Sequence, residues 1–235
     1  MQRRLAAAGL TAAPPRQARA WHNLIEAPMS GRKRWTHLDQ MIGEGYETEV
    51  NMGVKDRIER AEELAHRARV HLDLWVALTL KSAVDPFIDE LDEYDDFFRF
   101  TQAAHESVFI NRITSLLQPD KSAENIPGLI KDASRQTVIN PEVAHECRSA
   151  LAIINPMFRK VKLIRDNAMA HQHRYRKQPD IYIEAQVTLN GMVDLSDQVL
   201  SITGVMMQAI GRSPRTVYSN PVGSLERMLT ALKQV

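Results

Sequence analysis

The sequence predicts an all-α protein, a bundle of five to six helices. Apolar residues recur at spacings of three and four from about Val50 onward, which is typical of amphipathic helices. Several segments open with a capping residue followed by proline, the pattern of a helix start. No segment shows the two-residue alternation of a strand, and no repeat or phosphate-binding glycine loop is present.

The composition is that of a globular chain. Of 235 residues, 44 % are hydrophobic and 25 % are charged, which is enough apolar material for a core and excludes global disorder. The net charge of +1 excludes a histone-like polycation, although a local basic patch would still suffice to bind nucleic acid. The single cysteine, Cys147, excludes a disulfide framework and multi-cysteine metal sites. We therefore expect a cytoplasmic protein without membrane spans.

The N-terminal part differs in charge from the rest. Residues 1–38 hold seven basic residues against one acidic residue, a net charge of +6. We expect residues 1–50 to form a basic, poorly ordered extension and residues 51–235 to form the helical domain. Three interpretations of the extension stay open: translation from a misplaced start, a basic tail that contacts nucleic acid, or a targeting segment.

The first half of the domain reads as four helices. A long amphipathic stripe covers residues 58–79, and Asp-Pro opens an acidic helix over 85–98. Another apolar stripe over 103–117 ends before a proline. A short helix is expected within 122–136, opened by Ser122.

The next helix is long and carries an internal proline. Asn140 and Pro141 open it, and its apolar stripe continues to about His171. Pro156 is expected to kink or break it, since proline lacks the amide hydrogen that the helix needs. Cys147 lies on the apolar stripe and is expected to be a packed small hydrophobe.

The C-terminal third contains a polar connection and two helices. Residues 172–185 are expected to be a polar connection, with Pro179-Asp180 as a turn and 181–183 as a short extended piece. A helix is predicted over 186–211. Ser219-Asn220-Pro221 opens a last helix.

The most unusual segment runs from Lys160 to Lys177, where an apolar helix enters a polar, basic turn. It contains a single acidic residue among many basic ones. Its polar side chains are Arg165, Asp166, Asn167, His171, His173, Arg174, Tyr175, Arg176 and Lys177.

Part of this segment resembles a known motif. Residues 165–171, read Arg-Asp-Asn-Ala-Met-Ala-His, follow the order arginine, polar residue, a few variable residues, histidine. This order marks the HEPN superfamily, and the neighbourhood is most similar to its AbiU-like abortive-infection branch, where such a string ends a helix. Residues 107–117 resemble another helix of that branch, in which an arginine precedes an apolar residue and a leucine. The resemblance covers roughly residues 55 to 210.

The resemblance implies metal-independent cleavage of RNA, with no cofactor, as in a toxin or abortive-infection effector. Arg165 would stabilise the charged transition state, and His171 would act as general acid or base. Asp166 would orient one of these two side chains, with Asn167 in support. The expected products are a 2′,3′-cyclic phosphate and a 5′-hydroxyl.

The resemblance also implies partners. HEPN ribonucleases typically act as homodimers, and a regular helix separates Arg165 from His171 by about 9 Å of rise, so a second chain would help the two converge. RNA is the expected ligand, and the resemblance to HEPN toxins adds an antitoxin protein as a candidate partner. The residues expected to contact RNA are His173, Arg174, Tyr175, Arg176 and Lys177.

Structural interpretations of the same residues stay open. His171 near a helix C-terminus would interact favourably with the helix dipole. Arg165 and Asp166 would be exposed charges, and a direct pair between neighbours is not expected in a regular helix. His66 and His71 are expected at the surface or at caps. His171 and His173 without a third ligand do not make a metal site.

Two other functions are compatible with the sequence. One is a non-catalytic helical module that binds a partner protein, a nucleotide or RNA, since a fold does not determine a function. The other is a helical scaffold that matches the motif by coincidence. A basic, solvent-accessible cleft shared by Arg165 and His171 would favour the ribonuclease over both.

Overall fold

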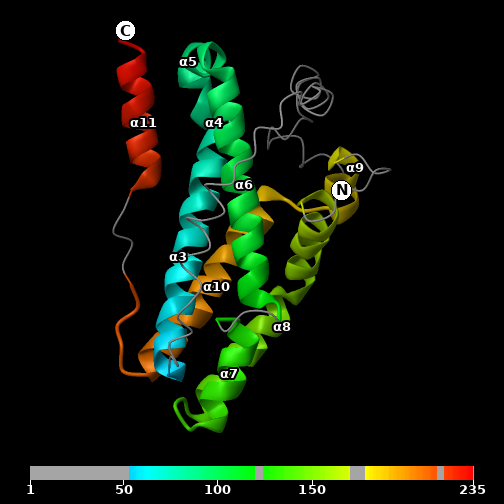
Figure 1. Ribbon diagram of the computed structural model, residues 1–235, viewed down its shortest axis with the longest axis vertical. Coiled ribbons are helices and arrows are strands. Elements are labelled where there is room, and N and C mark those ends of the chain that lie inside the picture. Colours follow the sequence, from blue (N-terminus) through cyan, green and yellow to red (C-terminus); the bar gives the residue numbers. More distant parts are fainter. Residues whose placement is uncertain (1–52, 120–123, 170–177, 216–219, 235) are drawn as a thin grey trace, which may run out of the picture. The chain divides into compact units, whose positions relative to one another are not determined.

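The structure is a computed structural model that describes residues 53–119, 124–169, 178–215 and 220–234. These residues form a helical bundle without strands (Figure 1), which confirms the all-α prediction. Helices α3, α6, α8 and α10 have more than 20 residues each: Val54–Thr79, Asp95–Leu117, Pro141–Ile164 and Leu189–Ala209.

The remaining elements are shorter. Helices α7, α9 and α11 bring the number with eight or more residues in the described part to seven, slightly above the five to six predicted. Two helical turns and a 3₁₀ turn connect α3 to α6, and a π-helical turn, η2, follows α8 directly. Their bounds are α4 Lys81–Val84, η1 Asp85–Phe87, α5 Ile88–Glu93, α7 Ile126–Arg135, η2 Arg165–Met169, α9 Gln178–Ala185 and α11 Pro221–Leu232.

Helix α3 is the central element of the core. It contacts α6, α10, α7 and α11, and three of these helices, α10, α7 and α6, also contact α8. Three of its buried positions, Ala61, Ala65 and Ala68, are alanines at spacings of three and four. Because alanine has only a methyl group, the neighbouring helices pack close to the α3 backbone and leave little free volume there.

Three asparagine caps determine where helices begin. The side-chain oxygens of Asn125, Asn140 and Asn220 accept hydrogen bonds at 2.7 to 2.8 Å from the amide three residues on. The predicted starts at Asn140 and Asn220 are confirmed. The short helix α7 begins after Asn125 instead of at Ser122, which lies outside the described residues.

Pro156 does not break α8, which continues from Pro141 to Ile164. An internal proline costs about 3 kcal/mol because it removes one backbone hydrogen bond. Buried residues on both sides of it, such as Ile154 and Val161, keep the two halves packed in one core. Tertiary packing therefore outweighs the local penalty.

The predicted acidic helix over 85–98 is wrong in its extent. The backbone leaves the helical conformation at Tyr94, with φ −110° and ψ 35°, and α6 begins at Asp95. Asp95 and Asp96 occupy the first turn of α6, where the positive end of the helix dipole favours carboxylates. This local preference places the break inside the acidic run.

The predicted polar connection over 172–185 is wrong in its last eight residues. Residues 178–185 form α9, with Pro179 in its first turn, and not a turn followed by an extended piece. Ile181 and Ala185 are one helical turn apart, and both are buried, while α9 contacts α8. This pair gives α9 one apolar face with the four-residue spacing of a helix. The two-residue spacing of Ile181 and Ile183, on which the extended piece was predicted, does not reveal that face.

No helix of the described part is long and apolar enough to cross a membrane. The described helices all belong to the compact unit Asn51–Val235. The predicted basic extension, residues 1–50, lies outside the described residues.

The alanines of α3 generate a prediction about stability. Ala68 has no exposed surface, so Ala68→Leu forces extra carbons into a filled interface and should lower the free energy of unfolding by about 1–3 kcal/mol. The control is Ala104→Leu on α6, whose side chain is exposed. Urea unfolding of both variants measures the difference, and equal stability of the two would contradict the close packing of α3.

Candidate functional site

Arg165 stands where α8 changes into a π-helical turn. Its Nε and Nη2 donate to Oδ1 of Asp166, at 2.8 and 2.5 Å. Its Nη1 donates to Oε1 of Gln118 at 2.8 Å, from the residue that follows α6. The guanidinium thus joins the ends of two helices, and these bonds use three of its five N–H groups.

Asp166 is held by cations on both of its oxygens. Lys162, one turn earlier on α8, donates to Oδ2, and Arg165 donates to Oδ1. Burial alone would raise the pKa of Asp166, but the hydrogen bonds and positive charges of Lys162 and Arg165 outweigh it and lower this pKa. Asp166 is therefore ionised near neutral pH.

The direct pair between Arg165 and Asp166 overturns the expectation that these neighbours would not meet. That expectation assumed a regular α-helix. A π-helical turn forms i→i+5 bonds and holds more residues per turn, so neighbouring side chains diverge less. The rise of about 9 Å expected from Arg165 to His171 also assumed a regular α-helix, whereas the described residues Arg165–Met169 form a π-helical turn.

Asn167 supports the turn through the backbone. Its Nδ2 donates to the carbonyl of Leu163 at 2.9 Å. A change from i→i+4 to i→i+5 bonding leaves carbonyls near the change without a regular partner. Asn167 satisfies one of them and so stabilises the turn that carries Arg165.

Six of the predicted site residues lie outside the described part of the chain. They fall in residues 170–177: His171, His173, Arg174, Tyr175, Arg176 and Lys177. The structure thus brings together Arg165 and Asp166, places Asn167 beside them on the same turn, and adds Gln118 and Lys162. The spacing of Lys162 and Asp166, four residues apart on a helix, was a signal that sequence reasoning missed. No sequence signal points to Gln118, because it lies 47 positions away from Arg165.

A second polar cluster lies between α3 and α6. Nδ1 of His71 and Nδ1 of His105 are 2.8 Å apart, so one ring donates a hydrogen bond to the other. Both rings are half-buried, which corrects the expectation that His71 lies at the surface or at a cap. Burial lowers the pKa of both histidines, and for His71 the charges of His105 and Arg112 lower it further.

The neighbouring carboxyl group, Glu106, faces a different helix. Its Oε1 accepts a hydrogen bond of 2.6 Å from Oη of Tyr182 on α9. Burial raises the pKa of Glu106, and the bond from Tyr182 only partly offsets this. Within the described residues, no group of three or more histidine, cysteine, aspartate or glutamate side chains is placed to hold a metal ion.

Comparison with known families identifies the class of this chain. Residues 55–228 match the family model HEPN_AbiU2, described as AbiU2. This match covers well over half of the chain, which therefore belongs to the AbiU2 family of HEPN domains, and the expected resemblance is confirmed. No curated protein and no solved structure gives a significant match. The match includes all residues from Arg165 to His171 and continues into α11.

The histidine pair generates a prediction about pH. Because both pKa values are lowered in the folded protein, the unfolded chain binds these protons more tightly. The pair's contribution to the free energy of unfolding is therefore complete above pH 6.5, the ordinary pKa of histidine, and is lost as the pH falls below it. Urea unfolding at about pH 7.5, 6.5 and 5.5 should show falling stability. His105→Gln should flatten this dependence, whereas His145→Gln, at an exposed position on α8, should not. An unchanged slope in His105→Gln would refute the assignment.

Proposed function

We propose that this chain is a metal-independent endoribonuclease that cleaves RNA through its 2′-hydroxyl and acts as a toxin or abortive-infection effector. The observation that carries the proposal is the anchored guanidinium of Arg165, within the motif segment of a HEPN chain. Asp166 and Gln118 hold it in one orientation while two of its N–H groups stay outside these bonds. A phosphate oxygen pair is the ligand that such a fork fits.

The charge balance of the site favours a phosphate. Lys162 and Arg165 carry two positive charges, and the ionised Asp166 carries one negative charge. The net charge of +1 attracts a phosphodiester and stabilises the additional negative charge of the transition state. Asp166 is therefore a positioning residue for Arg165.

RNA supplies its own nucleophile, the 2′-hydroxyl. In this proposal the imidazole of His171 removes that proton or protonates the leaving 5′-oxygen, since histidine exchanges protons near neutral pH. The bond from phosphorus to the 5′-oxygen breaks as the 2′-oxygen attacks, which leaves a 2′,3′-cyclic phosphate and a 5′-hydroxyl. The residues proposed to hold the RNA strand are His173, Arg174, Tyr175, Arg176 and Lys177.

The active form in this proposal is a cytoplasmic homodimer. Two chains related by a two-fold axis would place Arg165 of each near His171 of the other. A ribonuclease of this kind would harm its own cell, so an antitoxin protein that blocks the site is proposed as a further partner.

Cleavage by purified protein in the presence of a chelator tests the mechanism. Arg165→Ala should reduce cleavage about 100- to 1,000-fold, and His171→Ala about 100- to 10,000-fold, since these are typical losses for one charge-stabilising donor and one general acid–base group. The controls are Arg159→Ala and His145→Ala, at exposed positions on α8. End analysis should find 5′-hydroxyl and cyclic phosphate ends.

The outcomes separate the proposed enzyme from the other functions. Cleavage retained in both Arg165→Ala and His171→Ala would refute the assigned roles. RNA binding without cleavage by the wild type would instead indicate the non-catalytic module.

Mixing the two inactive variants tests the dimer. In a mixed dimer, the intact Arg165 of one chain meets the intact His171 of the other, so cleavage should return when Arg165→Ala and His171→Ala proteins are combined. Light scattering should show a dimer at the same concentration. A monomer that cleaves RNA at that concentration would contradict the shared site.

A further inference from the structure

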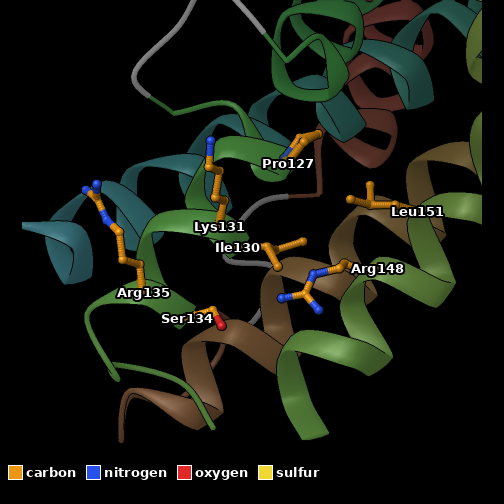
Figure 2. A pocket seen from close by; sticks show the side chains of 7 residues that line it. All are labelled: Pro127, Ile130, Lys131, Ser134, Arg135, Arg148 and Leu151. Carbon is orange, nitrogen blue, oxygen red and sulfur yellow. The ribbon is translucent and has the colours of Figure 1, made fainter. Parts of the chain in front are cut away.

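A basic groove lies between α7 and the first half of α8. Its cavity has a volume of about 480 Å³, and its floor includes the apolar side chains of Ile130 and Leu151. Lys131 and Arg135 rise from α7 and Arg148 from α8, and Figure 2 shows the Arg148 guanidinium extending from α8 toward α7. A cavity of this size holds a nucleotide but does not admit a duplex.

The groove carries positive charge that the described residues leave mostly uncompensated. None of the residues lining it is acidic. Lys131 and Arg148 form no ion pair with a described residue, and Arg135 has only Asp132, at 3.6 Å, with 73 % of its own side chain exposed. Figure 2 shows the Arg148 guanidinium on the α8 side and the head groups of Lys131 and Arg135 extending from α7 away from it, so the three cations are spread along the groove and favour an extended polyanion over a single small anion.

The groove continues toward the candidate site. A second cavity of about 310 Å³ shares Arg148 and Leu151 with the first, and it extends to Leu117, Pro119 and Phe158. Leu117 and Pro119 flank Gln118, whose side chain binds Arg165. Along α8, Arg148 and Arg165 are 17 residues apart, which corresponds to about 26 Å of helix rise.

We propose that this groove binds the backbone of single-stranded RNA and leads the strand to Arg165. The cations of α7 and α8 pair with phosphates, and the apolar floor receives a base or sugar face. The proposal rests on the proposed ribonuclease function and adds a substrate path on residues outside the HEPN motif. Charge complementarity selects a polyanion as the occupant, and a lining that combines cations with apolar side chains suits both the phosphates and the bases of a strand.

The test measures binding of a 2′-O-methyl RNA 12-mer by fluorescence anisotropy at several salt concentrations. This probe lacks a free 2′-hydroxyl, so binding does not depend on cleavage. Lys131→Gln/Arg148→Gln should weaken binding about 10-fold, and it should reduce the slope of log K against log salt by about 1.4, for two lost phosphate contacts. Lys81→Gln/Arg227→Gln, which removes two cations from α4 and α11, should change neither.

Three outcomes would overturn the proposal that the groove binds single-stranded RNA. One is unchanged affinity and salt slope in Lys131→Gln/Arg148→Gln. Another is loss of uridine monophosphate binding in this variant without loss of RNA binding, which would indicate a mononucleotide site. The third is groove-dependent binding of poly-glutamate in place of RNA, which would indicate a surface for an acidic protein.

A parallel cleavage assay on unmodified RNA separates the two proposals. If the wild type cleaves RNA while Lys131→Gln/Arg148→Gln binds the probe normally, RNA binding in the groove is refuted and the proposed ribonuclease activity is supported. If the variant loses probe binding and the wild type does not cleave RNA, RNA binding in the groove is supported and the proposed ribonuclease activity is refuted.

Discussion

The close packing of α3 against α6 is the interaction on which the rest of the structure depends. The small residues Ala61, Ala65 and Ala68 leave room for neighbouring helices, and α6 adds the fully buried Phe109 to the same core. Because α6 is held along much of its length, the residue after its end, Gln118, has a defined position. Gln118 then binds Arg165, so packing in the core determines where a guanidinium at the far end of α8 is held.

The hydrogen bonds that fix Arg165 in place do not cancel the positive charge of the site. Asp166 takes two bonds from Arg165 and one from Lys162, and its lowered pKa keeps it charged. A carboxylate that neutralised the guanidinium completely would weaken its attraction for an anion such as the proposed phosphate. The second cation, Lys162, prevents this, because it leaves the cluster with a net positive charge. The π-helical turn is the backbone device that allows the two neighbours to meet.

The site and the groove share one scaffold, helix α8. Its N-terminal half carries Arg148 into the groove, and its C-terminal end carries Arg165. An unbroken helix keeps these two cations at a constant separation, which a break at Pro156 would not. The continuity of α8 through its proline therefore matters for function in this proposal, and it comes from the burial of residues on both sides, as at Ile154 and Val161.

The sequence by itself determined what depends on neighbours along the chain: the all-α class, the caps at Asn140 and Asn220, the apolar stripe of α3, and the motif from Arg165 to His171 that marks the HEPN family. Each follows from side-chain periodicity, local hydrogen bonding or residue order. Only the tertiary structure decided the contact of Gln118 with Arg165, the His71–His105 pair and the groove beside Arg148. These contacts join residues from different helices, and their distances depend on how whole helices pack, which no local pattern encodes.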